Sequence, residues 1–226
     1  MSSIYIPAAA SQLQRYFSVS PSDFSVGNEV APGDMAPMIR VPQPGAALGD
    51  RACSQAMFGI VPHWAEMKIT SQTFSVRSEA PESKPVFRNA FKRGRFCLIP
   101  AESFFEASYE HGARKMRYEV AHADGSPMAM AGLWEFRPAT DEAGPLLSMS
   151  MFTINADEHP LMHRFGRPGD EKRMPVLIDA SLYDEWLHCP VEEAESFFRQ
   201  YPAERLIARP SPKARKKAGQ PSLPFI

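Results

Sequence analysis

The residue after the initiator methionine is the first candidate for chemistry. Ser2 is small enough that Met1 should be removed, which would expose a new α-amine. Because an α-amine titrates with a pKa of about 7.7–8.0, a useful fraction is neutral near pH 7 and can attack an aldehyde. The alternative is that residues 1–3 form a frayed terminus without a chemical task.

A carboxylate in an apolar segment is the second candidate. Glu106 lies in the run Ser-Phe-Phe-Glu-Ala at residues 103–107. Strand alternation places its side chain on the same face as Phe104. A carboxylate in such a strand is costly unless it has a partner or a task, so Glu106 is a candidate site residue. The alternative is an ordinary surface carboxylate.

Histidine and cysteine positions give little sign of a metal site. His159 and His163 have helical i,i+4 spacing, but Pro160 and the lack of an obvious third ligand argue against a metal. The three cysteines are far apart in the sequence, which suggests neither a disulfide framework nor a zinc site. We therefore expect reduced thiols, no metal and no cofactor. The cysteines are Cys53, Cys97 and Cys189.

Composition and patterning predict the elements that must position these residues. The chain has 226 residues, 22 of them proline, and a net charge of −1, so any nucleic-acid binding must come from local basic clusters. Short alternating runs predict strands at 3–7, 36–41, 95–100, 103–108, 116–121, 128–136, 147–154 and 174–178. Helices are predicted at 9–17, 84–94, 181–188 and 191–200. The pattern indicates an α+β fold with mainly antiparallel sheet.

The predicted organisation is one domain over residues 1–207 and a flexible basic tail over 208–226. The sequence shows neither a signal peptide nor an apolar run of membrane-spanning length. We expect a monomeric cytoplasmic protein without a membrane partner.

Several segments, in order, resemble motifs of the SOS-response-associated peptidase family, whose members process abasic sites in DNA. No single segment is decisive, but together they extend over most of the chain. They are Asn-Glu-Val-Ala-Pro-Gly at 28–33, Phe-Gly-Ile-Val-Pro-His-Trp at 58–64, Ser-Val-Arg-Ser-Glu-Ala at 75–80, Arg-Phe-Cys-Leu-Ile-Pro-Ala at 95–101, Ser-Phe-Phe-Glu at 103–106, Thr-Ile-Asn-Ala at 153–156 and Arg-Met-Pro-Val at 173–176.

The resemblance implies a pseudo-barrel with a positive groove for single-stranded DNA. It also implies that an N-terminal cysteine forms a Schiff base with the sugar aldehyde and then closes a stable thiazolidine ring. Position 2 is serine here, so the Schiff-base step survives in principle, whereas durable ring closure does not. Ile4 replaces an arginine of the family's N-terminal motif.

The resemblance also assigns supporting roles in this chemistry. Glu106 matches the family's general acid/base, and Ser75 stands in place of a supporting asparagine. The family's histidine aligns with Gly166, three residues after His163. Either His163 substitutes after a register shift, or the histidine is lost and His163 is a surface residue.

Four further positions are DNA-binding candidates through the same resemblance, together with the retained Glu79. Trp64 would stack on bases, or it is a core tryptophan. Arg77 would bind phosphate, or it pairs with Glu79 along the strand. The remaining two, in a basic cluster that could line a phosphate groove, are Arg164 and Arg173.

Residues 220–226, Gln-Pro-Ser-Leu-Pro-Phe-Ile, resemble the peptides that dock bacterial DNA-processing proteins on the replication sliding clamp. The alternative is a disordered or strand-pairing tail.

The residues and the resemblance together leave three functions open. They are an abasic-site processing protein that reacts through the Ser2 amine, a DNA-binding module that has lost the covalent chemistry, and an N-terminal-serine hydrolase or peptidase, which would need an oxyanion hole.

Overall fold

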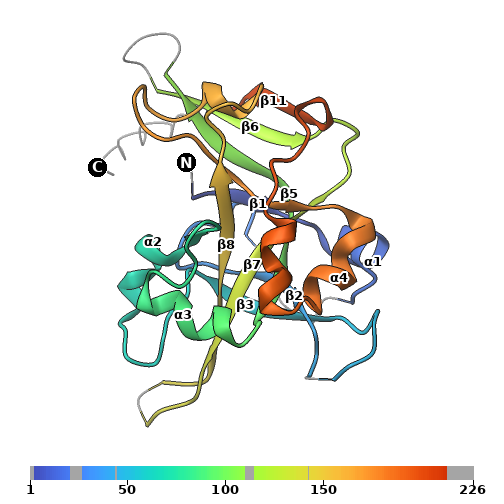
Figure 1. The fold of residues 1–226 in the computed structure, drawn as a ribbon, viewed down its shortest axis with the longest axis vertical. Helices are drawn as coiled ribbons and strands as arrows, with labels where there is room; N and C mark the ends of the chain where they lie inside the picture. The colour runs from blue at the N-terminus through green and yellow to red at the C-terminus, as the bar shows by residue number, and fades with distance from the viewer. Residues whose placement is uncertain (1–2, 21–26, 44, 110–114, 142, 213–226) are drawn as a thin grey trace, which may run out of the picture.

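A closed ring of five strands forms the centre of the fold (Figure 1). The computed structural model describes residues 3–20, 27–43, 45–109, 115–141 and 143–212. In the ring, β3 and β8 run parallel, the other neighbours are antiparallel, and pairing of β5 with β7 closes the circle. The five strands are β2 (Met35–Arg40), β3 (Ala52–Phe58), β5 (Phe96–Ser108), β7 (Met128–Arg137) and β8 (Leu146–Asn155).

Six further strands of the described residues extend this ring. On the β5 side, β1 (Tyr5–Pro7) and β6 (Met116–His122) both pair with β5, and β11 (Leu206–Pro210) pairs with β6. On the β8 side, β4 (Ser75–Arg77) and β9 (Arg173–Pro175) pair with β8, while β10 (Leu177–Ile178) pairs with β7. The pair of β6 and β11 lies at one end of the molecule, at the top of Figure 1.

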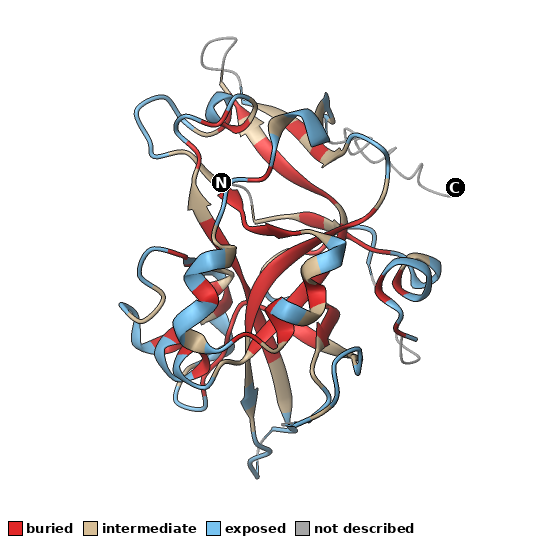
Figure 2. Cartoon of the chain, turned by 45° about the vertical axis from the view of Figure 1, so that its right-hand side comes forward, coloured by how far each residue is buried: buried red, intermediate tan, exposed pale blue. Residues whose placement is uncertain are grey.

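Alternation along the ring strands produces two apolar clusters. In β5, Cys97 and Ile99 belong to one cluster, whereas Phe96 and Leu98 belong to the other. The second cluster also contains the buried residues of helices α1 (Ala10–Phe17), α3 (Pro85–Lys92) and α4 (Tyr183–Leu187). Figure 2 shows this buried band running through the strands beneath the helices. The strands are therefore fixed from both faces.

The α+β class with mainly antiparallel strands is confirmed, and the largest differences from the predicted elements lie in 95–108, 174–178 and 191–200. Predicted strands 95–100 and 103–108 are one strand, because β5 pairs with β7 up to Ala101 and with β6 from Ser103 onward. Proline at position 100 is tolerated next to this change of partner. Predicted strand 174–178 is divided between β9 and β10, which pair with different neighbours. Predicted helix 191–200 is a 3-10 helix, Val191–Phe197.

The remaining described helices are short: α2 (Thr70–Thr73) and the 3-10 turns Met67–Ile69, Met162–Arg164, Ala180–Leu182 and Ala203–Arg205. Within the described residues, no helix has the length and apolar character needed to cross a membrane. Strand β11 continues to Pro210, three residues past the predicted domain boundary at 207. Residues 220–226 and most of the predicted basic tail lie outside the described residues.

Candidate functional site

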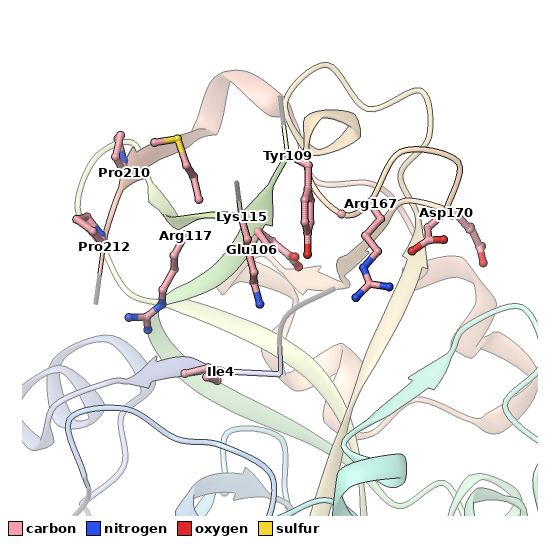
Figure 3. A pocket seen from close by; sticks show the side chains of 13 residues that line it. Ile4, Glu106, Tyr109, Lys115, Arg117, Arg167, Asp170, Pro210 and Pro212 are labelled. Carbon is pink, nitrogen blue, oxygen red and sulfur yellow. The ribbon is translucent and has the colours of Figure 1, made fainter. Parts of the chain in front are cut away.

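A cavity of about 900 Å³ opens beside the start of β1, between β5, β6 and the loop that precedes β9 (Figure 3). Segments far apart in the sequence contribute to its wall, including the end of β11. The lining residues used below are Ile4, Glu106, Tyr109, Lys115, Arg117, Gly166, Arg167, Asp170 and Glu171.

Backbone hydrogen bonds between these segments hold the cavity together. The Phe105 N–H donates to the Ile4 carbonyl at 3.0 Å, which ties the N-terminal segment to β5. On the other wall, the Gly166 N–H donates to the Ala107 carbonyl at 2.7 Å. The neighbouring residues Ser108 and Phe165 form an isolated β-bridge. Ile4, the β5 acid and the Gly166 loop therefore have fixed relative positions.

Glu106 is the acidic group of the β5 wall. Its side chain points into the cavity in Figure 3, and the residue is only 2% exposed. In β5 it lies opposite Tyr118 of β6. The alternative of a surface carboxylate is therefore wrong. A buried carboxyl group at the wall of a cavity is the arrangement in which an acid or base can exchange a proton with a bound molecule.

Arg117 and Arg167 are two cations on opposite walls. Arg117 is held in β6, where its Nη2 lies 2.6 Å from Oε1 of Glu29 and its guanidinium stacks over the Phe105 ring. Arg167 lies in the loop, where a side-chain hydrogen bond with Tyr109 raises its pKa, helped by the charge of Asp170. Both guanidinium groups therefore have contacts that hold them in the cavity lining.

Gly166 lies in the cavity wall at the position that aligns with the family's histidine. Its φ is +80°, a conformation that residues with a Cβ atom rarely adopt. A Cβ atom there would meet only the Lys172 side chain, at 3.7 Å from Nζ. There is space for a side chain, but the backbone of this loop favours glycine.

The two candidate histidines lie outside the cavity lining. His159 is buried, its Nδ1 accepts from the N–H groups of Leu161 and Met162, and its Nε2 donates to the Tyr201 carbonyl at 2.7 Å. Both ring nitrogens therefore bind backbone. His163 is exposed, and its Nδ1 lies 2.8 Å from the His159 carbonyl. A replacement of the family's histidine by His163 stays a prediction.

The arginines of the predicted phosphate groove are engaged in ion pairs at the cavity rim. Arg77 pairs with Glu171 at 3.0 Å, so the expected alternative of pairing with Glu79 is wrong. Glu79 pairs instead with Arg173, whose side chain is only 9% exposed and which also binds Glu171. The rim is thus a four-residue network of alternating charge. Binding of DNA by Arg77, Glu79 and Arg173 stays a prediction.

The other predicted site residues are dispersed. Trp64 is 58% exposed, so the alternative of a core tryptophan is wrong. Ser75 is half-buried in β4 beside Met151 of β8, and Arg164 is exposed; neither lines the cavity. Ser2 lies outside the described residues, two positions before the lining residue Ile4.

None of the three cysteines lines the cavity. Burial raises the pKa of Cys53 and of Cys189 to about 11, and that of the fully buried Cys97 well above its ordinary value. All three are therefore thiols rather than thiolates at neutral pH, and no internal cysteine takes the place of a terminal one.

Sequence reasoning found Glu106 but missed Tyr109, Lys115 and Arg117. Tyr109 directly follows β5, and Lys115 and Arg117 reach the cavity because β6 pairs with β5 in the register that sets Met116 opposite Ser108. The alternating pattern of 116–121 predicted a strand there, but it did not indicate which strand would pair with it. Arg167 lies in the segment between Arg164 and Arg173, the two residues of the predicted basic cluster.

The fold and cavity define a barrel protein whose acid-containing cavity faces the start of its first strand. Within that class, the chain belongs to the SOS response associated peptidase (SRAP) family, whose model matches residues 4–216. The resemblance of the sequence motifs to this family is confirmed.

Two curated relatives of this chain have names that refer to the processing of abasic sites. The abasic site processing protein YoqW of Bacillus subtilis is 31% identical over 132 residues, which are 58% of this chain and 55% of that protein. The abasic site processing protein HMCES of Gallus gallus is 22% identical over 194 residues, 74% of this chain and 55% of that protein. The chain therefore spans about half the length of the curated relatives it matches.

Two solved structures share the fold. A Bordetella bronchiseptica protein is 29% identical with a TM-score of 0.84, and the match covers 93% of this chain and 100% of that one. A Bacteroides thetaiotaomicron protein is 18% identical with a TM-score of 0.78, covering 94% and 93% respectively. The second likeness, at its lower identity, shows the fold alone.

Proposed function

We propose that this protein processes abasic sites in DNA, binding single-stranded or junction DNA during the response to DNA damage. The cavity carries the proposal, because it combines a buried carboxyl group, Glu106, with the cations Arg117 and Arg167 beside Ile4. The names of the relatives YoqW and HMCES support the same substrate. Cationic walls suit the phosphates on either side of a missing base, and an acid suits the ring-opened sugar.

In this proposal the α-amine of Ser2 attacks the sugar aldehyde and Glu106 exchanges the protons. The amine forms a C–N bond to the aldehyde carbon, and loss of water gives an imine. A thiol at position 2 would then close the ring, but the serine hydroxyl is a poor nucleophile for that step. We therefore expect a reversible imine rather than a permanent cross-link.

The second candidate is a DNA-binding module without covalent chemistry. Gly166 favours it, because the position that aligns with the family's histidine has no side chain and a backbone suited to glycine. Together with Ser2, this would remove two reactive groups while leaving the cations in place. Such a protein would recognise abasic or junction DNA and shield it.

Borohydride trapping distinguishes the two candidates. The full chain is mixed with a single-stranded oligonucleotide carrying one abasic site, with and without borohydride, and binding is followed by fluorescence anisotropy. An adduct formed only with borohydride supports the reversible imine. An adduct stable without reduction contradicts the expected loss of ring closure. Binding without any adduct supports the module, and neither binding nor adduct rejects both functions.

The role of Glu106 is tested by Glu106→Gln, which keeps the size of the side chain. We expect imine trapping to slow by about 10²–10⁴-fold, the usual contribution of a positioned proton-transfer group, with DNA affinity unchanged. The matched control is Glu102→Gln, on the same strand but outside the cavity lining, which should trap at the wild-type rate.

A further inference from the structure

Lys115 is a second amine of the cavity. It immediately precedes β6, and among the described lining residues it is the only lysine. Its side chain is exposed and its nitrogen points into the cavity in Figure 3, on the same side as Glu106. No thiol competes with it, because the three cysteines lie elsewhere.

Strand β6 is paired on both of its edges directly after Lys115, whose side chain is exposed. The next residue, Met116, pairs with Ser108 of β5. On the opposite side of β6, the Ser211 N–H donates to the Arg117 carbonyl at 2.9 Å. The lysine therefore extends from an anchored strand end, which aims its amine at the cavity.

The charged neighbours of the cavity are suited to an amine that must lose a proton. Glu106 is a buried carboxylate in the same cavity and can accept a proton from the lysine amine. The cations Arg117 and Arg167 line the same cavity, each beside an acidic residue, Glu29 and Asp170 respectively.

We infer that Lys115 is a Schiff-base nucleophile that competes with the Ser2 amine for the abasic-site aldehyde. This inference rests on the proposed function. The Nζ lone pair forms a bond to the aldehyde carbon, and the carbonyl oxygen takes a proton to give a carbinolamine. The carbinolamine then releases one water molecule to give the imine, so no oxidant or reductant is consumed.

The chain lends itself to mapping which amine reacts. Cleavage at glutamates gives an N-terminal peptide ending at Glu29 that contains no lysine, so its α-amine is the only amine there. It also gives the peptide 111–119, in which Lys115 is the only lysine. After borohydride reduction at saturating abasic DNA, mass spectrometry of these two peptides assigns the adduct.

We expect a reduced adduct on peptide 111–119 of the wild-type chain. Lys115→Arg keeps the positive charge but removes the primary amine, so this adduct should be lost while DNA binding is retained. The matched control is Lys68→Arg, at an exposed lysine outside the cavity, which should keep it.

Two outcomes overturn the inference in distinguishable ways. An adduct confined to the N-terminal peptide, with equal yields in wild type and Lys115→Arg, rejects Lys115 and leaves the proposed function standing. No reduced adduct on either peptide rejects the Schiff-base chemistry itself, and the role of Lys115 with it.

Discussion

Arg173 binds Glu79 through both of its terminal nitrogens. Its Nη2 lies 2.8 Å from Oε2 of Glu79, and its Nη1 lies 3.1 Å from Oε1. The same Nη1 lies 2.6 Å from Oε1 of Glu171, a residue of the cavity wall, and the hydrogen bond from Arg173 lowers the pKa of Glu171. One guanidinium therefore joins the segment after β4, strand β9 and the cavity rim. Its planar geometry is what allows it to serve two carboxylates.

Replacing Arg173 by methionine should lower the free energy of unfolding by about 1–3 kcal/mol. This loss is smaller than the loss expected on breaking a fully buried ion pair, because the side chain of Glu79 is half exposed and water screens its charge. Urea unfolding followed by circular dichroism measures the change. The matched control is Arg77→Met, whose side chain is 68% exposed and which should cost about 0–1 kcal/mol. If the two substitutions lowered the free energy of unfolding equally, the bidentate pair would stabilise the fold no more than the exposed pair of Arg77 does.

Asp184 should give the protein part of its acid sensitivity. The hydrogen bond from Arg51, Nε to Oδ1 at 2.8 Å, lowers the pKa of Asp184 in the folded state. The unfolded chain therefore takes up this proton at a higher pH than the folded chain. The resulting stabilisation is complete above the unfolded pKa of about 3.9 and is lost as pH falls through the lower folded pKa.

Asp184→Asn should accordingly flatten the loss of unfolding free energy between pH 5 and pH 2, measured with urea at each pH. In an Arg51→Gln background, the Asp184→Asn substitution should have much less effect on that slope, because the partner is already gone. An undiminished effect in that background would assign the acid sensitivity to another interaction.

The elements of the fold were largely predictable, because they depend on local pattern. The alternation in 128–136 and 147–154 predicted β7 and β8 within one residue at each end. The register could not be predicted: β5 was expected as two strands, 95–100 and 103–108, whereas the structure has one strand that exchanges β7 for β6 as its partner between them.

The candidate site was predictable only where one residue carried its own signal. Glu106 stood out as a carboxylate in an apolar strand, and its burial agrees with that reasoning. Lys115 and Arg117 gave no such signal, since their importance comes from the cavity that distant segments build around them. The predicted pairing of Arg77 with Glu79 was also wrong, because their partners Glu171 and Arg173 come from β9 and the residues just before it, far away in the sequence.

Gly59, in the motif that begins at Phe58, should not tolerate alanine. Its φ is +108°, and a Cβ atom there would lie 2.6 Å from Cβ and 2.8 Å from the carbonyl oxygen of Thr70. Gly59→Ala should therefore lower the free energy of unfolding by about 2–5 kcal/mol, from backbone strain and overpacking together. Chemical denaturation at neutral pH measures the loss.

Gly49→Ala isolates the contribution of backbone strain. Its φ of +91° is similar, but no heavy atom lies within 4 Å of the added Cβ. This variant should lose only about 1–2 kcal/mol. If the two variants were equally stable, contact with Thr70 would have no part in the requirement for glycine.

Trp64 should contribute to DNA binding without contributing to stability. Its exposure of 58% means that Trp64→Ala removes little packing, so the free energy of unfolding should change by no more than about 0.5 kcal/mol. If the side chain stacks on a base, the same substitution should weaken single-stranded DNA binding by about 1–3 kcal/mol, as measured by fluorescence anisotropy. Tyr16→Ala, at another exposed aromatic residue on α1, provides the control and should bind DNA like the wild type. If the Trp64→Ala and wild-type proteins bound DNA with equal affinity, Trp64 would not belong to the DNA-binding surface. A large loss of stability would instead show that the exposed ring contributes to the stability of the fold.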